Sequence, residues 1–425
     1  MRIVIIGNSA TAVGAVESIR QHDQTAEVLI ISEEPHMIYS RPLLSHYLAG
    51  EIDRSRLAYR GADFYIKHHV TAVLEDRVIA IEPDAHRVHT ASGAEYTYDK
   101  LLIATGGQPI VPPTPGQGLE GVFTMTRLSD AERLLIYLRT HTVRHVVVVG
   151  GGMIGMKVTE ALVKRGLGVT MVELAPLILS AALDRTASHM MTGLLQQGGV
   201  NIYTENSVAE IGAQDGHVAG VALKDGQVLP CDSVIFGVGV RPNADLARQA
   251  GLRVNRGIVV DEYMRTSAPD LYAAGDVAEA YDLVVDMNRT VAIWPNAYRQ
   301  GAIAGAHMVG VSRPDKGGIA MNTVEAMGVP AMSIGYGNAP EGEYEVVADL
   351  DASRHTYRRL VLKENRLIGA ILVGQIDRAG IYTGLIRNRI DISEHRRNLL
   401  SGHLSLLSLP DQYRKHVVRG VGIEV

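Results

Sequence analysis

The chain has 425 residues, too many for a single compact core, and is predicted to form two or three domains. Its 46% hydrophobic and 20% charged residues are typical of a soluble globular protein, and its few aromatic residues indicate cores of Val, Ile, Leu and Ala, as in buried parallel strands. A formal net charge of −5 argues against a nucleic-acid partner.

The sequence shows no sign of a membrane-spanning helix or a signal peptide. No apolar run reaches the ~18 residues of a membrane-spanning helix. The first apolar strand begins at residue 2, which leaves no room for a signal peptide, so we expect a cytoplasmic protein.

The single cysteine, Cys231, excludes an internal disulfide, a CxxC pair and a cysteine-held iron–sulfur cluster. Because free Cys usually behaves as a small hydrophobic residue, we interpret Cys231 as structural.

The first predicted unit begins with "RIVIIGNSATA". It reads as a strand over 2–6, a turn of small residues, a helix near 10–21 and a strand over 27–32 that ends in Glu33. This is a βαβ unit of about the usual ~30 residues. Its loop is degenerate, because only Gly7 of the three glycines typical of a dinucleotide-binding turn is kept.

The same unit recurs further along the chain in "VVVVGGGMIG". A strand over 145–149 and a helix near 153–165 flank a complete GxGxxG, followed by a strand that ends at Glu173. In this pattern the first glycine allows a tight turn, the second lets a pyrophosphate approach, and the third lets helix and strand pack closely. A carboxylate at Glu173 would accept a hydrogen bond from a ribose 2′-OH and repel a 2′-phosphate, which favours NAD(H) over NADP(H). The alternative is a helix turn that binds no nucleotide.

Three further stretches end apolar strands in turns. Two of them consist of an apolar strand, a turn of glycines and then a predicted crossing between domains: "LLIATGGQP" (101–109) and "SVIFGVGVRPN" (233–243). "LYAAGDVA" (271–278) places Asp276 beside a helix start, where a carboxylate suits polyol hydroxyls rather than a metal. A helix is expected near 296–309.

From about residue 320 shorter strands and hairpin signals predict a separate α+β domain. Residues 354–425 hold 13 Lys/Arg and 6 Asp/Glu, a net of +7, so residues 1–353 carry −12 (28 minus 40). This asymmetry indicates either a docking surface for an acidic partner or an ordinary solvated face. The Leu-rich, basic stretch 392–420 would suit a docking helix, a groove for a partner, or a helix that closes the domain.

The motifs "GNSATA", "LLIATGG", "GGGMIG", "GVGVRPN" and "LYAAGDVA", in this order and spacing, resemble the pyridine nucleotide–disulfide oxidoreductase class of flavoproteins. The resemblance covers roughly residues 1–375. It is closest to the branch without the disulfide, which includes rubredoxin and ferredoxin reductases and the flavin part of NADH-dependent nitrite reductases. It implies an α/β fold with two Rossmann-like domains and a C-terminal α+β interface domain. The expected boundaries are 1–111 with 240–319 for FAD, 112–239 for NAD, and 320–425 for the interface.

The resemblance also implies the cofactor contacts, residue by residue. For FAD these are Gly7, Ser9, Ala10, Ala12, Glu33, Arg41, Pro42, His46, Val78, Ala104, Thr105, Gly106, Arg127, Gly275, Asp276, Trp294 and Pro295. For NAD(H) they are Gly150, Gly152, Met153, Ile154, Gly155, Glu173 and Gly239. No metal site is predicted, since the 16 histidines contain no HExxH pattern and "HH" at 68–69 suggests a surface turn.

Two positions depart from the family's pattern. His46 stands where related ferredoxin reductases often carry Lys, and it is either a residue that tunes the flavin or a spectator. Lys157 stands where a Glu usually follows the third glycine by two residues, near the nicotinamide in relatives. No other residue is expected to be catalytic, because hydride passes from nicotinamide to flavin by stacking and positioning.

Without a thiol pair there is no thiolate relay, so electrons must leave the flavin for an outside acceptor. The first hypothesis is an NADH-dependent FAD enzyme that passes electrons to an iron–sulfur or rubredoxin-type protein, as a free enzyme or as a subunit of a larger complex in which electrons could flow toward NAD. The alternatives are an NADH oxidase that reduces O₂ and a protein that binds FAD and NAD without turnover. The C-terminal domain is expected to form a homodimer or a hetero-oligomer.

Overall fold

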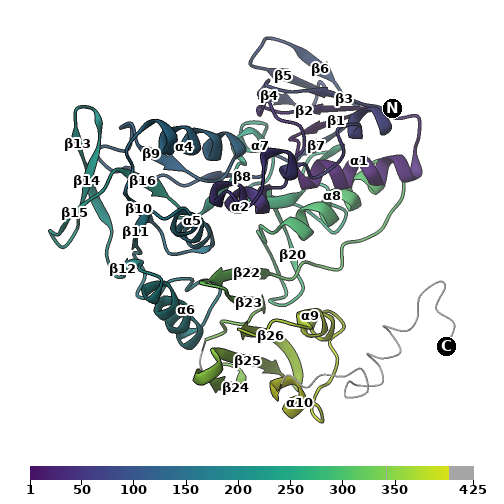
Figure 1. Ribbon diagram of the computed structural model, residues 1–425. Helices are drawn as coiled ribbons and strands as arrows, with labels where there is room; N and C mark the ends of the chain where they lie inside the picture. The colour runs from purple at the N-terminus through teal and green to yellow at the C-terminus, as the bar shows by residue number, and fades with distance from the viewer. Residues whose placement is uncertain (341, 402–425) are drawn as a thin grey trace. The chain divides into compact units, whose positions relative to one another are not determined.

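The computed structural model describes residues 1–340 and 342–401 (Figure 1). The chain folds as two compact units. The first contains Met1–Ile110, Thr126–Leu128 and Val240–Gly318; the second contains Val111–Met125, Ser129–Gly239 and the chain from Ile319 onward. Among the described residues, no helix is long and apolar enough to cross a membrane.

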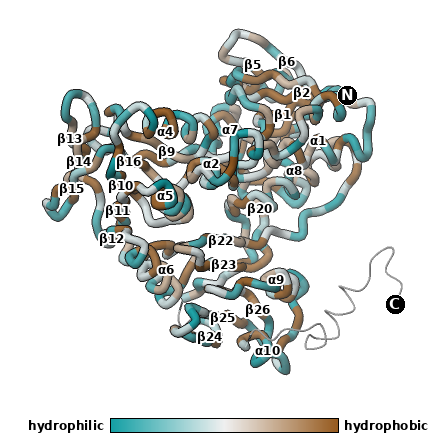
Figure 2. Tube along the Cα trace, in the orientation of Figure 1, coloured by the Kyte–Doolittle hydropathy of each residue, from teal (hydrophilic) through white to brown (hydrophobic). Residues whose placement is uncertain are grey.

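The first unit is built on a five-stranded parallel sheet in the order β19-β7-β1-β2-β3. Its central strands are runs of Ile, Val and Leu that are almost wholly buried, as expected for parallel strands covered on both faces. Figure 2 shows the hydrophobic colour along β1 and β2. The strands are β1 (Arg2–Ile6), β2 (Glu27–Ile31), β3 (Val70–Val73), β7 (Lys100–Ile103) and β19 (Leu271–Ala273).

Smaller elements complete this unit. An antiparallel sheet contains β4 (Val78–Glu82), β5 (Arg87–Thr90) and β6 (Glu95–Thr97), and another contains β18 (Ile258–Val259), β20 (Ala278–Asp282) and β21 (Met287–Arg289). The pair β8 (Gly107–Pro109) and β17 (Val240–Pro242) is antiparallel. The helices are α1 (Ala10–His22), α2 (Leu44–Ala49), α3 (Phe64–Lys67), α7 (Asp245–Gln249) and α8 (Trp294–Met308), with 3₁₀ turns η1 (Arg41–Leu43), η2 (Arg54–Leu57) and η3 (Gly275–Val277).

The second unit repeats the parallel arrangement in the order β12-β11-β10-β16-β9. Its strands are β9 (Val122–Thr124), β10 (His145–Val149), β11 (Gly168–Val172), β12 (Asn201–Tyr203) and β16 (Ser233–Phe236), and its helices are α4 (Leu128–Thr140), α5 (Met153–Lys164) and α6 (Arg185–Gln197). A three-stranded antiparallel sheet contains β13 (Val208–Gln214), β14 (His217–Leu223) and β15 (Val228–Pro230).

The same unit includes an antiparallel C-terminal sheet in the order β22-β23-β26-β25-β24. Its strands are β22 (Met321–Ala326), β23 (Val329–Gly335), β24 (Glu345–Asp351), β25 (Thr356–Lys363) and β26 (Arg366–Val373), with helices α9 (Ala379–Arg387) and α10 (Arg396–Ser401) and the turn η4 (Ala352–Arg354). This confirms the mixed α/β class with two Rossmann-like sheets and an α+β C-terminal part. The three-domain division stays a prediction.

A buried ion pair connects the C-terminal sheet to α6. Asp184 caps α6 by accepting from the Ala187 amide at 3.1 Å, and its second oxygen accepts from Tyr357 Oη at 2.6 Å and from Arg359 Nη1 at 3.3 Å. The side chains of Asp184 and Arg359 are only 9% and 7% exposed. Arg359 also donates to the carbonyls of Gly337 and Ala339, which compensates for part of its desolvation.

The helices α1 and α8 approach each other at backbone distance. A Cβ built on Gly301 would lie 2.0 Å from the Thr11 carbonyl oxygen, and one on Gly305 would lie 2.4 Å from the Ala15 carbonyl oxygen. On the facing helix, a Cβ on Gly14 would lie 2.1 Å from the Tyr298 carbonyl oxygen. Only glycine fits at these contacts, so α8 is held directly against the helix that follows β1.

We predict opposite effects for two helical Gly→Ala substitutions. Gly301→Ala should destabilise the protein by about 1–3 kcal/mol, since the new methyl group overlaps the α1 backbone. Gly193→Ala in α6, where a Cβ meets nothing within 4 Å, should stabilise by about 0.5–1 kcal/mol through helix propensity alone. Thermal unfolding of both variants checks this, and equal shifts in the melting temperature would contradict the backbone contact.

Candidate nucleotide-binding sites

The turn after β1 lies next to the turn after β19. Gly7 has φ +119° and donates its N–H to the Ile31 carbonyl at 2.8 Å, and a Cβ there would lie 2.2 Å from the Ala104 carbonyl oxygen. Gly275 is equally restricted, because a Cβ on it would lie 2.2 Å from Thr11 Oγ1. The predicted motifs around Gly7, Ala104 and Gly275 are therefore gathered at one end of one parallel sheet, next to the start of α1.

Three polar side chains lie at this end of the sheet. Ser9 is the N-cap of α1, yet its side chain makes no capping hydrogen bond. Asp276 follows Gly275 in η3, and burial raises the pKa of its carboxyl group while the Arg41 charge opposes the shift. Asn296, in the first turn of α8, is 6% exposed and its Nδ2 has no hydrogen-bond partner among the described residues. N–H groups at a helix start and a half-buried carboxyl are what a phosphate and polyol ligand such as FAD requires.

A charged network surrounds Arg41. Its guanidinium donates to Glu34 Oε1 at 2.5 Å and to the Thr126 carbonyl at 2.8 Å, and lies 5.5 Å from the centroid of the Tyr39 ring. Tyr39 in turn donates to Glu34 Oε2 at 2.6 Å, and burial raises the pKa of its hydroxyl. Of these three residues the sequence predicted only Arg41 as a cofactor contact; the roles of Glu34 and Tyr39 come from tertiary contacts with it.

Glu33, the predicted ribose acceptor of the first unit, pairs with Arg127 Nη2 at 2.6 Å. Both residues were predicted to contact FAD from segments far apart in the sequence, and the structure brings them together. The pair also anchors residues 126–128 to the first unit, along with a hydrogen bond from the Leu128 amide to Tyr39 Oη.

The other residues predicted for FAD lie on several elements of the first unit. Thr105 Oγ1 donates to the Asn243 carbonyl at 2.8 Å, and Gly106 accepts from the Asn243 amide, so the two predicted crossing segments run side by side. His46 on α2 is half-exposed and contacts Glu51 through Nδ1 at 2.5 Å. The remaining positions are the first residue of α1 (Ala10), the buried face of α1 (Ala12), η1 (Pro42), the first residue of β4 (Val78) and the first turn of α8 (Trp294, Pro295).

In the second unit, the three glycines of the GxGxxG loop have different surroundings. A Cβ on Gly155 would lie 1.8 Å from the Gly150 carbonyl oxygen, and one on Gly150 would lie 2.7 Å from the Gly237 carbonyl oxygen. A Cβ on Gly152 or Gly239 meets nothing within 4 Å. The first and third glycines thus serve packing, and the second leaves open space at the N-terminus of α5, where Met153 and Ile154 begin the helix.

Glu173 lies directly beside this loop. Its carboxylate accepts from the Gly151 amide at 2.5 Å and from the Ala175 amide at 2.7 Å. The two hydrogen bonds fix a negative charge next to the space left by Gly152. Lys157 lies half-buried one turn into α5.

Cys231 belongs to the core of the second unit. It is 4% exposed, and burial together with the neighbouring Asp232 raises its pKa to about 12. A thiol with this pKa is protonated at neutral pH and is a poor nucleophile. The structural interpretation of Cys231 agrees with this environment.

Comparison with known proteins gives the family. The sequence model described as pyridine nucleotide-disulphide oxidoreductase matches residues 1–301, and that of the rubredoxin NAD+ reductase C-terminal domain matches residues 321–390. The chain belongs to the pyridine nucleotide–disulphide oxidoreductase family.

Three known proteins are similar to this chain in sequence or in structure. The nitrite reductase [NAD(P)H] of Bacillus subtilis (strain 168) is 30% identical over 92% of this chain, which spans only 48% of that relative's length. Subunit epsilon of the NADH-dependent phenylglyoxylate dehydrogenase of Aromatoleum evansii is 29% identical, with 95% of this chain and 96% of the relative covered. A putidaredoxin reductase, solved in covalent complex with putidaredoxin, matches with a TM-score of 0.86 at 26% identity, with 94% and 95% of the two chains covered.

We predict that Glu173 sets the preference for NADH. Glu173→Gln keeps an oxygen that can accept from the Gly151 amide but removes the charge that would repel a 2′-phosphate. The ratio of kcat/KM for NADH to that for NADPH should fall about tenfold or more, as expected for losing a charged hydrogen-bond acceptor. The matched control is Glu210→Gln on β13, an exposed residue with the same charge change. An unchanged ratio in Glu173→Gln would contradict the assignment.

We also predict that turnover needs no thiol. Cys231→Ala should retain NADH-dependent reduction of ferricyanide, and N-ethylmaleimide should leave the folded enzyme active, because the buried thiol is protonated. The same reagent should label the unfolded chain once, which shows that it reaches Cys231 when the core is open. Inactivation of the folded protein at the rate of labelling would argue for a thiol in the reaction.

Proposed function

We propose that the chain oxidises NADH and passes the electrons to an iron–sulfur or rubredoxin-type protein. The observation that carries the proposal is the state of Cys231, the one cysteine of the 425 residues, which is buried with a pKa of about 12. Electrons therefore have no thiol to reach within the chain. Bound FAD supplies the needed chemistry, since it accepts two electrons as hydride and can release them singly.

The residues of the first unit would hold the flavin cofactor. Asp276 would accept hydrogen bonds from ribityl hydroxyls, and Arg41, held by Glu34, would face the pyrophosphate. The N-terminus of α8 would carry partial positive charge toward the flavin ring and stabilise its negative charge after reduction. Asn296 Nδ2 would donate there as well, which would satisfy a buried group that has no partner among the described residues.

The second unit would hold the nicotinamide cofactor. Its pyrophosphate would lie at the start of α5, over Gly152, and its adenosine ribose would bond to Glu173. The same contacts serve either direction of electron flow. Similarity to a phenylglyoxylate dehydrogenase subunit over nearly the full length of both chains supports a role within a larger redox complex, in which electrons could run toward NAD.

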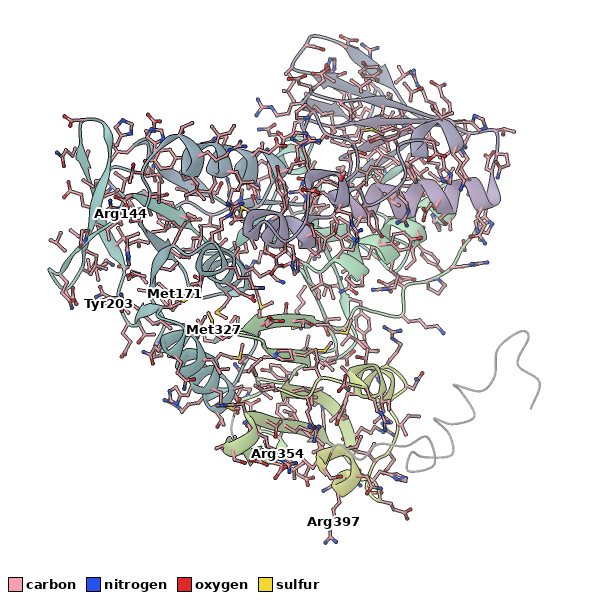
Figure 3. All side chains as sticks on the ribbon, viewed as in Figure 1. Arg144, Met171, Tyr203, Met327, Arg354 and Arg397 are labelled. Atoms are coloured by element: carbon pink, nitrogen blue, oxygen red, sulfur yellow. The ribbon has the colours of Figure 1, made fainter. Side chains whose placement is uncertain are left out.

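The C-terminal sheet offers cationic residues for an acidic partner. Arg354 is 76% exposed although its Nε lies 3.6 Å from Asp351 Oδ2, and Arg397 is exposed on α10 and projects outward in Figure 3. Arg396 is only 27% exposed and is paired with Glu345 and with Asn365 Oδ1, so it serves the fold. The predicted docking stretch 392–420 lies mostly outside the described residues, and the oligomeric state also stays a prediction.

The experiment compares acceptors of an enzyme that is first reduced under anaerobic conditions. The enzyme reduced by NADH is mixed in a stopped-flow instrument with rubredoxin, with a [2Fe–2S] ferredoxin, or with oxygenated buffer. We expect at least one protein acceptor to reoxidise it more than tenfold faster than O₂. Oxygen as the fastest acceptor would instead identify an NADH oxidase, and a flavin that NADH does not reduce would leave the proposal without its first step.

We predict that docking is electrostatic. Arg354→Glu combined with Arg397→Glu should lower kcat/KM for the protein acceptor several-fold and weaken its salt dependence, because rim charges act mainly on the association rate. NADH–ferricyanide turnover should not change. The matched control is Arg253→Glu combined with Arg256→Glu, two exposed arginines of the first unit. A similar loss in the control would indicate net charge rather than a docking surface.

A further inference from the structure

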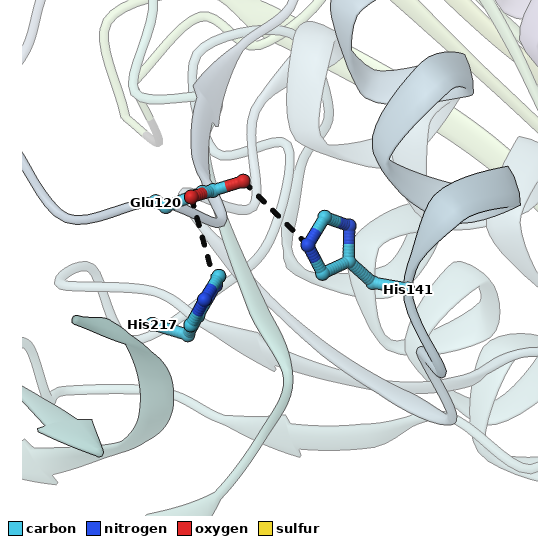
Figure 4. Close-up of side chains that lie close together, drawn as sticks. All are labelled: Glu120, His141 and His217. Atoms are coloured by element: carbon cyan, nitrogen blue, oxygen red, sulfur yellow. Dashed lines mark ion pairs between the residues drawn. The ribbon is translucent and has the colours of Figure 1, made fainter. Parts of the chain in front are cut away.

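Among the described residues, one cluster of possible metal-ligating side chains belongs to neither predicted nucleotide-binding loop. Glu120 precedes β9, His141 follows α4, and His217 is the first residue of β14, all within the second unit. The ligand atoms of these three side chains lie within 4.8 Å of one another. Figure 4 shows the Glu120 carboxylate between the two imidazole rings.

The distances in the cluster are not those of hydrogen bonds. Glu120 Oε1 lies 3.6 Å from His141 Nε2, and Glu120 Oε2 lies 3.8 Å from His217 Nδ1. Both exceed the 2.7–3.2 Å range of an N–H···O bond. Two N or O ligands about 2.0–2.1 Å from a tetrahedral zinc ion are separated by roughly 3.3 Å, so a small adjustment would close the cluster around a metal.

The His141 imidazole is held in place, and each of the two imidazoles presents one nitrogen to Glu120. Thr140 Oγ1 lies 3.0 Å from His141 Nδ1, which leaves Nε2 for Glu120, and the Tyr137 ring stacks on His141 at 4.2 Å. His217 Nδ1 is buried and has no hydrogen-bond partner among the described residues. The backbone holds Glu120 close to His217, because the amide of the next residue, Val218, donates to the Glu120 carbonyl at 3.1 Å. A hydrogen bond to the second nitrogen of a histidine is typical of metal ligands.

We propose that Glu120, His141 and His217 bind one Zn²⁺ ion, with the fourth position open to water. Two imidazoles and one carboxylate suit Zn²⁺, whereas Mg²⁺ and Ca²⁺ prefer oxygen ligands alone. The ion would connect three segments: the loop before β9, the end of α4 and the β13–β14 hairpin. None of the three residues belongs to the predicted nucleotide contacts, so the site is independent of the proposed electron transfer.

The test is zinc binding to the FAD-loaded enzyme. After treatment with EDTA and its removal, titration calorimetry with zinc chloride should give one ion per chain, and zinc should raise the melting temperature. Glu120→Gln, which preserves side-chain shape, and His141→Ala should each weaken binding at least about tenfold, as expected for loss of one of three ligands. The control is His189→Ala on α6, an exposed histidine of the same unit, which should bind like the wild type.

X-ray absorption at the zinc edge gives a second measurement. The proposal expects nitrogen and oxygen neighbours at about 2.0–2.1 Å with the signature of two imidazoles. Magnesium chloride at the same concentration should leave the melting temperature unchanged. Failure of the wild type to bind one zinc ion, or equal weakening in His189→Ala, would overturn the site. NADH–ferricyanide turnover does not depend on either result, so the zinc proposal and the electron-transfer proposal can fail separately.

Discussion

The fold depends on how closely a helix backbone can approach the turn that precedes it. In the second unit this limit is reached at Gly155, where a side chain would overlap the Gly150 carbonyl. In the first unit the equivalent position is Ala12, which is fully buried, and the closest approach occurs instead between α1 and α8 at Gly14 and Gly301. Each parallel sheet therefore places a helix N-terminus at the ends of its strands, but with different packing partners. Phosphate binding needs this arrangement, since it brings unpaired N–H groups and the helix dipole together.

The parts of the fold that follow from local pattern could be predicted from the sequence. The predicted βαβ elements around Gly7 and Gly150 differ from α1, β2 and α5 by only one residue at an end, because buried strands of Val and Ile give a strong signal and glycines end them. The helix expected near 296–309 begins two residues earlier, at Trp294, since Pro295 is tolerated in the first turn.

What depends on tertiary contact could not be predicted. The Glu34–Tyr39–Arg41 network needs residues 126–128 to complete it, and the Asp184–Arg359 pair connects α6 with a strand far along the chain. Glu120, His141 and His217 fall in three separate segments with no metal-binding spacing, so the sequence predicted no metal site at all. Side chains brought together by different loops leave no periodic signal, which is why this candidate site becomes visible only in three dimensions.

The arginines of the C-terminal part have two roles, pairing with carboxylates of the fold and presenting charge to a partner, which a net charge does not separate. Residues 354–425 carry a net charge of +7, yet Arg359 is buried against Asp184 and Arg396 is paired with Glu345. Arg359 satisfies a buried carboxylate, and the charge of Arg396 is offset by Glu345 at the surface, so both contribute less to the field that a partner meets. The charge available for recognition is therefore concentrated on exposed residues such as Arg397 and Arg354, which is 76% exposed beside Asp351. An acidic electron carrier would be steered by that smaller set, and exchanging one buried arginine for another residue would change stability before it changed docking.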